Sequence, residues 1–216
     1  FVKDKLENNK SNIYILCVGT PVGSNKSPKL ESILEVLESL VKFLKKGDSI
    51  FLRSTLPTGT CREIIVPYIE SFTDLKIGKD LFLSFTPERT VEGNAINELS
   101  SLPQIVGGYS KNCVEKARSF WSNLSKAVVE VESLEAAEMV KLINNTFRDI
   151  SFAFANEVAL RCDEYNINSF DLIAAANNGY PRNKISLPSP GVGGYCLTKD
   201  PILFYQKNLD NIISLA

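Results

Sequence analysis

The run Asn12-Ile-Tyr-Ile-Leu-Cys-Val-Gly19 is short, almost continuously apolar and closed by a glycine. Such a run is typical of a β-strand that is buried on both faces of a parallel sheet. A helical repeat of leucine, isoleucine and valine follows at residues 30–44, and a second apolar run at residues 49–54. Ser27-Pro28 predicts the start of the helix, with serine as N-cap and proline in the first turn. Strand, helix and strand in close succession predict an α/β fold.

The same alternation continues as far as Val131. Thr58-Gly59 opens a second helical pattern, and further elements are expected in the order strand, strand, helix, strand, at residues 81–85, 104–106, 111–123 and 127–131. Short connections between these elements predict a doubly wound sheet with its strands in parallel order.

Beyond Val131 the pattern is helical without strands. Ser133 is a suitable N-cap, and apolar residues recur at steps of three or four as far as about Leu160. A helix of roughly 30 residues would be about 45 Å long, a length typical of a link between domains or of a dimer interface. A shorter helix at residues 169–176, a loop rich in proline and glycine at 181–194, and a helical pattern from Pro201 follow.

The composition argues against several classes of partner. The chain has 216 residues, of which 44% are hydrophobic and 23% charged, and a net charge of −1. There is no clustered basic excess, so we expect neither nucleic acid nor an anionic membrane surface as a partner. No apolar run approaches the roughly 20 residues that span a bilayer, and no signal-peptide pattern opens the chain. We therefore expect a cytoplasmic protein.

Cysteine and histidine usage limits the chemistry. The five cysteines include no CxxC pair, since the two closest, Cys162 and Cys196, are 34 residues apart, and an odd number argues against a disulfide framework. Histidine is absent, which removes the commonest zinc ligand and the commonest general base. We expect no metal site, and any acid–base chemistry must use Lys, Asp, Glu, Cys or Tyr.

The stretch Gly191-Val-Gly-Gly-Tyr-Cys-Leu-Thr-Lys-Asp200 contains the first candidate for chemistry. Cys196 leaves a glycine-rich turn and precedes Lys199, and a nearby cation favours the nucleophilic thiolate. A free cysteine is equally well explained as a small buried hydrophobe. Spacing alone leaves both interpretations open for Cys196, whereas for Cys17, inside an apolar strand, the buried interpretation is favoured.

Three further groups carry suitable side chains. Lys141 and Asn145 are four residues apart and share one face of the long helix, where a partly buried ammonium could stabilise an oxyanion, although a solvated lysine is the commoner case. Residues 54–57 (Ser-Thr-Leu-Pro) and 87–89 (Pro-Glu-Arg) each follow a strand, at the edge where open α/β sheets bind ligands. Ordinary capped turns with an ion pair would explain both equally well.

Taken together, these motifs resemble the nucleotide-sugar 6-dehydrogenases, the UDP-glucose/GDP-mannose dehydrogenase superfamily. The resemblance covers nearly the whole chain and is closest to the UDP-N-acetylmannosamine and UDP-N-acetylglucosamine branch. Its motifs occur in the family's order: Cys-Val-Gly-Thr-Pro (17–21), Ser-Thr-Leu-Pro (54–57), Pro-Glu-Arg (87–89) with Glu92-Gly93, Leu-Pro-Gln-Ile-Val-Gly-Gly (102–108), Lys-Leu-Ile-Asn-Asn (141–145), Tyr-Pro-Arg (180–182) and the stretch 188–200. Tyr195 departs from the small residue, proline or histidine found there in relatives.

The resemblance implies an NAD-dependent, four-electron oxidation of the C6 alcohol of a UDP-sugar to a uronate, for polysaccharide precursor synthesis. Cys196 would form a thiohemiacetal and then a thioester, Lys141 and Asn145 would hold the oxyanion, Asp200 and Thr55 would position water, and Glu88 would assist hydrolysis. The implied cofactor-binding residues are Thr20, Pro21, Ser54, Thr55 and Glu92; the implied substrate-binding residues are Glu88, Arg89, Lys141, Asn145, Arg182 and Gly193. UDP-N-acetylmannosamine is slightly favoured as the substrate.

The resemblance also implies a domain organisation. Residues 1–131 correspond to the C-terminal part of a Rossmann-like NAD-binding domain, 132–200 to an all-α central domain for dimerisation and catalysis, connected by the long helix, and 201–216 to the start of a UDP-binding domain. The usual GxGxxG loop does not occur in the sequence. We therefore expect a fragment that is inactive alone and whose central helix forms a homodimer.

Two alternatives remain. One is a two-electron β-hydroxyacid dehydrogenase of the 6-phosphogluconate type, which shares the lysine and asparagine pair and needs no cysteine. The other is a non-catalytic scaffold that keeps the dimer helix for assembly.

Overall fold

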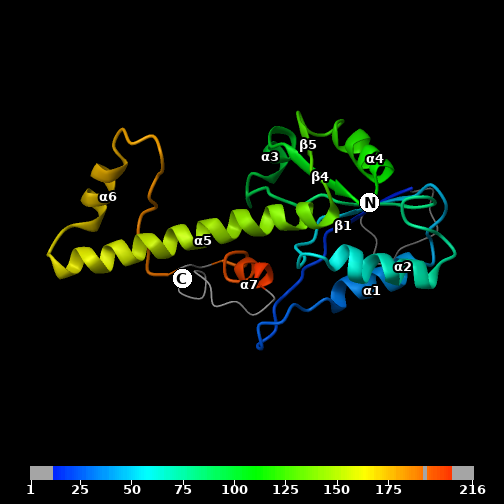
Figure 1. Ribbon diagram of the computed structural model, residues 1–216, viewed down its shortest axis with the longest axis horizontal. Coiled ribbons are helices and arrows are strands. Elements are labelled where there is room, and N and C mark those ends of the chain that lie inside the picture. Colours follow the sequence, from blue (N-terminus) through cyan, green and yellow to red (C-terminus); the bar gives the residue numbers. More distant parts are fainter. Residues whose placement is uncertain (1–11, 192–193, 206–216) are drawn as a thin grey trace. The chain divides into compact units, whose positions relative to one another are not determined.

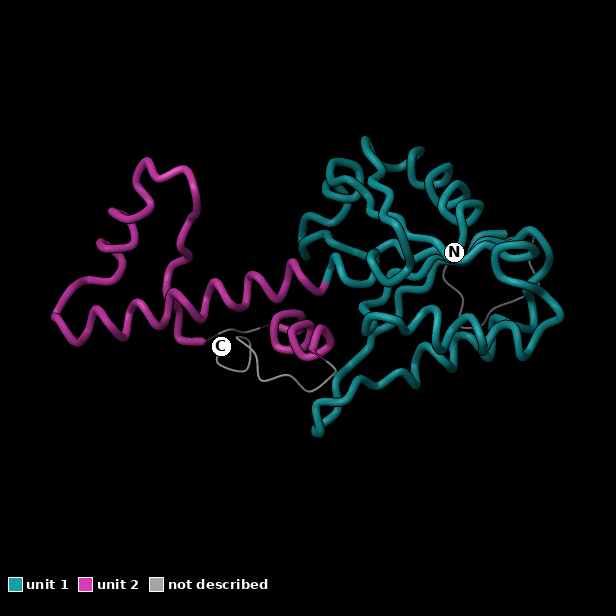
Figure 2. Tube along the Cα trace, in the orientation of Figure 1, with its two compact units in different colours: residues 1–141 teal, residues 142–216 magenta. Residues whose placement is uncertain are grey.

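The computed structural model describes residues 12–191 and 194–205, and the chain divides into two compact units, residues 1–141 and 142–216 (Figure 2). The first unit is a sheet with helices on both of its faces, and the second is helical (Figure 1). The long helix α5 (Leu134–Glu164) belongs to both units, because the division falls within it. The predicted α/β fold, a partial Rossmann-like sheet followed by an all-α domain, is confirmed.

The sheet has five strands in the order β1-β2-β3-β4-β5: Ile13–Leu16, Ser49–Leu52, Phe82–Phe85, Gln104–Gly108 and Val128–Glu130. All neighbours pair in parallel except β3 and β4, which are antiparallel. The expectation of parallel order throughout is therefore wrong at this pair. The register joins Phe85 to Gly107, so β4 begins beyond the carboxyl end of β3 and runs back along it. Helix α3 (Ala95–Ser101), which the periodicity does not predict, lies in this connection.

Strand β2 shows why helices cover both faces of the sheet. Successive side chains of a strand point to opposite faces. Ile50 and Leu52 lie in a core with α1 (Glu31–Leu40) and α2 (Val66–Phe72). Phe51 lies in a second core with the helix α4 (Lys111–Trp121). All three side chains are fully buried, which accounts for the unbroken apolar run in the sequence.

Strand β1 differs from the prediction that it is buried on both faces. Leu16 is buried and Tyr14 packs against the same core, but Ile13 and Ile15 point to the other face and are exposed. Helix α4 covers that face over β2 to β5. Cys17 follows directly after the strand and is exposed as well, so its interpretation as a buried thiol is wrong.

Helix α1 begins four residues later than its predicted cap. Ser27 accepts a hydrogen bond from the Gly23 amide (2.8 Å) through its carbonyl oxygen, and its hydroxyl donates to Asn25 (2.6 Å). The serine is thus engaged in a turn, and Pro28 forms an isolated bridge with Val22. Without a side-chain cap, the helix starts at Glu31.

The helices after the sheet follow the prediction closely. Ser133 Oγ accepts a hydrogen bond from the Ala136 amide (3.1 Å), which caps the first turn of α5. Asn168 caps α6 (Ser169–Asn177), and α7 (Asp200–Phe204) begins immediately before Pro201. Within the described parts of the chain, none of the helices is both long and apolar enough to cross a membrane.

Gly107 of β4 packs tightly against the start of α5. A Cβ at this position would overlap the carbonyl oxygen of Ser133 and lie 2.7 Å from Ala137 Cβ. Because backbone must move to make room, we expect Gly107→Ala to lower the free energy of unfolding by about 3 kcal/mol, the upper end of ordinary overpacking. Val129→Ala, at an exposed position of β5, is the control. Equal chemical denaturation midpoints for the two variants would contradict this packing.

Candidate active site

The first group of predicted residues lies at the carboxyl ends of β1 and β2. Thr20 and Thr55 are buried, and Thr20 Oγ1 donates a hydrogen bond to the Thr55 carbonyl oxygen. The backbone amides of Arg53 (2.9 Å) and Ser54 (3.2 Å) both donate to the Leu16 carbonyl oxygen. Thr20 and Thr55 are thus fixed side by side. Pro21 follows Thr20 on the exposed side of this edge.

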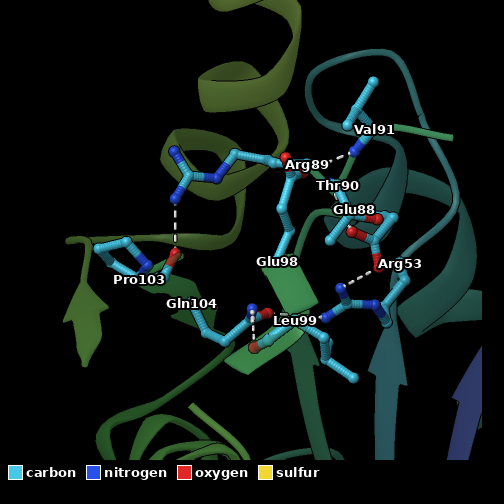
Figure 3. A network of polar contacts seen from close by, with 9 residues as sticks. All are labelled: Arg53, Glu88, Arg89, Thr90, Val91, Glu98, Leu99, Pro103 and Gln104. Atoms are coloured by element: carbon cyan, nitrogen blue, oxygen red, sulfur yellow. Dashed lines mark hydrogen bonds and ion pairs between the residues drawn. The ribbon is translucent and has the colours of Figure 1, made fainter. Parts of the chain in front are cut away.

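Arg53, a buried residue outside the predicted motifs, lies beside this group. Arg53 is only 5% exposed and directly follows β2. Its Nη1 donates to Gln104 Oε1 (3.1 Å) and its Nη2 pairs with Glu88 Oε2 (Figure 3). Its guanidinium lies 4.4 Å from the ring centre of Trp121. The planar fork of an arginine allows all three contacts at once. An arginine immediately before Ser-Thr was the only signal in the sequence.

The carboxylate of Glu88 is held through both oxygens. Oε2 pairs with Arg53 and Oε1 accepts a hydrogen bond from the Thr90 amide (2.8 Å). Burial raises the pKa of Glu88, but the hydrogen bonds from Arg53 and Thr90 outweigh it, so the pKa lies below the ordinary value. Glu88 is therefore an ionised, oriented carboxylate.

The other predicted residues of this loop point elsewhere. Arg89 Nη2 donates to the Pro103 carbonyl oxygen (2.5 Å), which attaches the loop to the start of β4 (Figure 3). The Val91 amide donates to Glu98 of α3 (2.7 Å), and Glu92 is exposed. Within the first unit, Glu88 alone of the predicted loop residues meets a side chain at the end of β2.

Helix α5 carries Lys141 and Asn145 one turn apart, and both are partly buried. One turn earlier, the buried carboxylate of Glu138 accepts hydrogen bonds from the amides of Gly59 (2.6 Å) and Cys61 (2.8 Å). These amides open the π-helical turn η1 (Cys61–Ile65), which precedes α2. Burial raises the pKa of Glu138, and the hydrogen bonds from Cys61 and Gly59 oppose that rise. Glu138, another residue that the motif search missed, thus anchors α5 next to the loop that follows Thr55.

The second unit contains the candidate nucleophile. Cys196 is exposed, and its carbonyl oxygen accepts a hydrogen bond from the Asp200 amide (2.8 Å), so one helical turn joins the two residues. Asp200 is fully buried and its Oδ2 accepts a hydrogen bond from Asn145 Nδ2 (2.6 Å). Its other oxygen has no hydrogen bond in the described structure and lies 3.6 Å from Lys199 Nζ, which also lies 4.7 Å from the ring centre of Tyr195. The structure thus joins Cys196, Asp200 and Asn145.

Two predicted substrate residues remain. Arg182 is exposed and its guanidinium lies 5.2 Å from the Tyr180 ring centre. Gly193 falls outside the described residues.

The predicted site residues of both units fall within regions that match known protein domains. Residues 2–125 match the NAD-binding domain of the UDP-glucose/GDP-mannose dehydrogenase family, and residues 135–214 match its central domain. The chain belongs to the UDP-glucose/GDP-mannose dehydrogenase family. The two matches meet near the start of α5, close to where the fold changes from sheet to helices.

Individual members of this family are similar to this chain in sequence and in structure. A UDP-N-acetyl-D-mannosamine dehydrogenase from Pyrococcus horikoshii is 37% identical over 95% of this chain and 49% of its own. The solved structure of that dehydrogenase from the same organism aligns with a TM-score of 0.89, at 34% identity over 95% of this chain and 49% of that chain. The corresponding Staphylococcus aureus enzyme aligns with a TM-score of 0.83, at 35% identity over 93% and 48%. This chain spans about half the length of the curated relatives that it matches.

Glu138 provides a test of how α5 is anchored. A glutamine keeps one acceptor oxygen but turns an amide NH2 toward a backbone donor, so Glu138→Gln leaves a buried N–H without an acceptor. We expect a loss of about 1–3 kcal/mol in the free energy of unfolding. The matched control is Glu135→Gln on the same helix, which breaks a partly exposed pair with Arg62 and should cost less than about 1 kcal/mol. Equal losses in urea unfolding would contradict the anchoring role.

Proposed function

We propose that this chain supplies part of the NAD site and the catalytic cysteine of a dehydrogenase that oxidises C6 of a UDP-N-acetylhexosamine to the carboxylate, in the synthesis of polysaccharide precursors. The observation that carries the proposal is the exposed Cys196, one turn before the buried Asp200, which holds Asn145 of α5. The two family matches and the names of the relatives support it, and those names favour UDP-N-acetylmannosamine as the sugar. A cytoplasmic location would keep the Cys196 thiol reduced.

The chemistry proceeds through a covalent bond to Cys196. Loss of a hydride from C6 and of the hydroxyl proton converts the C6 alcohol to an aldehyde, and the Cys196 thiolate adds to the aldehyde carbon. The thiohemiacetal then loses a second hydride to give a thioester, and water cleaves the C–S bond, releasing the carboxylate and the free thiol. Lys141 and Asn145 stabilise the oxyanion, as preorganised donors do in acyl transfer. Asp200 and Thr55 position the water, and Glu88 assists hydrolysis.

The carboxyl edge of β1 to β3 has the chemistry that NAD requires. Ligands of open α/β sheets bind at this edge. Thr20, Ser54 and Thr55 lie there, and Thr86 after β3 has a buried hydroxyl without a hydrogen-bond partner among the described residues. We infer that Thr20, Pro21, Ser54 and Thr55 contact the dinucleotide, with Glu92 close to it. When bound, NAD accepts each hydride, so one sugar consumes two NAD.

Arg89, Arg182 and Gly193 are proposed to bind the sugar nucleotide together with Glu88, Lys141 and Asn145. The domain assignment that follows is an NAD-binding part over residues 1–131, a helical part over 132–200 and the start of a UDP-binding domain over 201–216. Arg182 is exposed and is therefore accessible to a ligand.

The exposed face of α5 supports a homodimer. Ile143, Phe147 and Phe154 recur at steps of four and seven and form one stripe, in which Phe147 is 72% and Phe154 is 55% exposed. Large apolar side chains gathered on one surface mark an interaction site. We propose that this stripe packs against the same stripe of a second copy.

Charged residues on this stripe should dissociate the dimer. We expect the double variant Phe147→Glu, Phe154→Glu to sediment as a monomer at concentrations where the unmodified protein is a dimer. Arg148→Glu, on another face of the same helix, should leave the dimer intact. Dimers in both variants, measured by sedimentation velocity, would overturn the proposal.

Removing the thiol tests the covalent route. In the complete gene product we expect two NADH per UDP-N-acetylmannosamine, and for Cys196→Ala a loss of net oxidation by roughly 1,000-fold or more, as for other nucleophiles. The control is Cys17→Ser, which changes an exposed thiol that the proposed chemistry does not use. UDP-N-acetylglucosamine and UDP-glucose, assayed in parallel, identify the sugar.

One NADH per sugar, with full activity in Cys196→Ala, would support the two-electron dehydrogenase instead. Absence of NAD and UDP-sugar binding would support the scaffold.

A further inference from the structure

We infer that Arg53 is a positioning residue of the proposed reaction: it fixes Glu88 in one orientation at the carboxyl edge of the sheet, so that Glu88 acts as a fixed anion rather than as a proton acceptor. This inference rests on the proposed function, and it concerns a residue outside all the motifs that carry the family resemblance.

Arg53 is itself immobilised by its contacts. Its side chain is 5% exposed, and its three contacts come from three separate segments of the chain: Gln104 at the start of β4, Glu88 after β3 and Trp121 at the end of α4. Gln104 is oriented in turn, because its Nε2 lies 3.4 Å from the Leu99 carbonyl oxygen. The arginine that meets Glu88 is therefore held at a fixed position.

The Glu88 carboxylate is engaged through both oxygens but is still partly exposed. One carboxylate oxygen pairs with Arg53 and the other accepts from the Thr90 amide, while the side chain remains 38% exposed. A carboxylate that already accepts hydrogen bonds from a cation and an amide is a weak proton acceptor. Its exposed part still presents a negative charge of fixed direction, which can orient a water molecule or a substrate hydroxyl.

Other Glu–Arg pairs in the first unit do not share this arrangement. Arg62 pairs with Glu135 and lies 5.2 Å from the Tyr109 ring centre, but its side chain is 43% exposed. That pair is a surface contact with the same chemical groups, and it provides a matched comparison for Arg53.

The experiment uses the complete gene product with Arg53→Gln and Arg53→Lys, and Arg62→Gln as the control. NADH formation from UDP-N-acetylmannosamine and NAD is followed between about pH 5 and pH 9, the range in which catalytic groups titrate. We expect Arg53→Gln to lower kcat by about 100-fold through misplacement of Glu88. Without Arg53, burial raises the pKa of Glu88, so the acid limb of the pH profile should also move to higher pH.

The Arg53→Lys variant separates the orientation of Glu88 by the guanidinium from the effect of the positive charge on the Glu88 pKa. Lysine keeps the positive charge but not the fork, so Arg53→Lys should recover the acid limb of the unmodified protein while kcat stays reduced. Arg62→Gln should change neither quantity. An unchanged acid limb in Arg53→Gln, or the same shift in Arg62→Gln, would overturn the inference.

A second measurement keeps this result apart from the proposed function. Carbon-13 NMR of the glutamate carboxylates, with the Glu88 signal assigned from Glu88→Gln, reports its pKa without turnover. A higher pKa of Glu88 in Arg53→Gln would support the role of Arg53 whether or not the protein is active. If the unmodified protein formed no NADH, the proposed function would be rejected but the role of Arg53 would not. If Arg53→Gln does not fold, Gln104→Leu removes one of the three contacts, and unchanged kcat in that variant contradicts the inference.

Discussion

The carboxylate of Glu138 joins the long helix α5 to the loop that follows β2. It is buried, and it accepts hydrogen bonds from the amides of Gly59 and Cys61. A buried carboxylate is unfavourable unless strong donors replace water, and two backbone amides at the start of a helix do so. Through this contact the loop after Thr55 is fixed to the turn of α5 immediately before Lys141. The positions of Thr55 and Lys141, two residues with proposed catalytic roles, therefore depend on one side chain.

The two carboxylates with proposed roles in hydrolysis have different surroundings. Glu88 pairs with Arg53 and is partly exposed, whereas Asp200 is fully buried, with an amide of Asn145 on one oxygen and Lys199 3.6 Å from the other. The guanidinium orients the Glu88 carboxylate, whereas Oδ1 of Asp200 accepts no hydrogen bond among the described residues. This difference suits a reaction that requires both fixed charge and water activation.

The accuracy of the sequence predictions varied with the type of physical signal. Strand and helix positions followed hydrophobic periodicity, and the Ser133 cap of α5 was correct because its hydroxyl oxygen accepts a hydrogen bond from the Ala136 amide. Ser27 failed as a cap because Asn25 and Gly23 engage it in a turn. The exposure of Ile13 and Cys17 was missed, since an apolar run does not reveal whether helices cover both faces of its strand. The antiparallel β4 was missed because strand direction depends on where the connecting chain runs.

The amino-acid sequence by itself determined the α/β class, the long helix, the candidate cysteine and the motifs that resemble a dehydrogenase family. These features are local: each depends on periodicity, on caps or on residue types at short spacing. The tertiary structure decided that Arg53 meets Glu88, that Glu138 anchors α5 to the loop of Gly59, and that Asp200 meets Asn145. Those pairs are separated by 35, 79 and 55 residues, and contacts at such separations depend on the packing of whole elements.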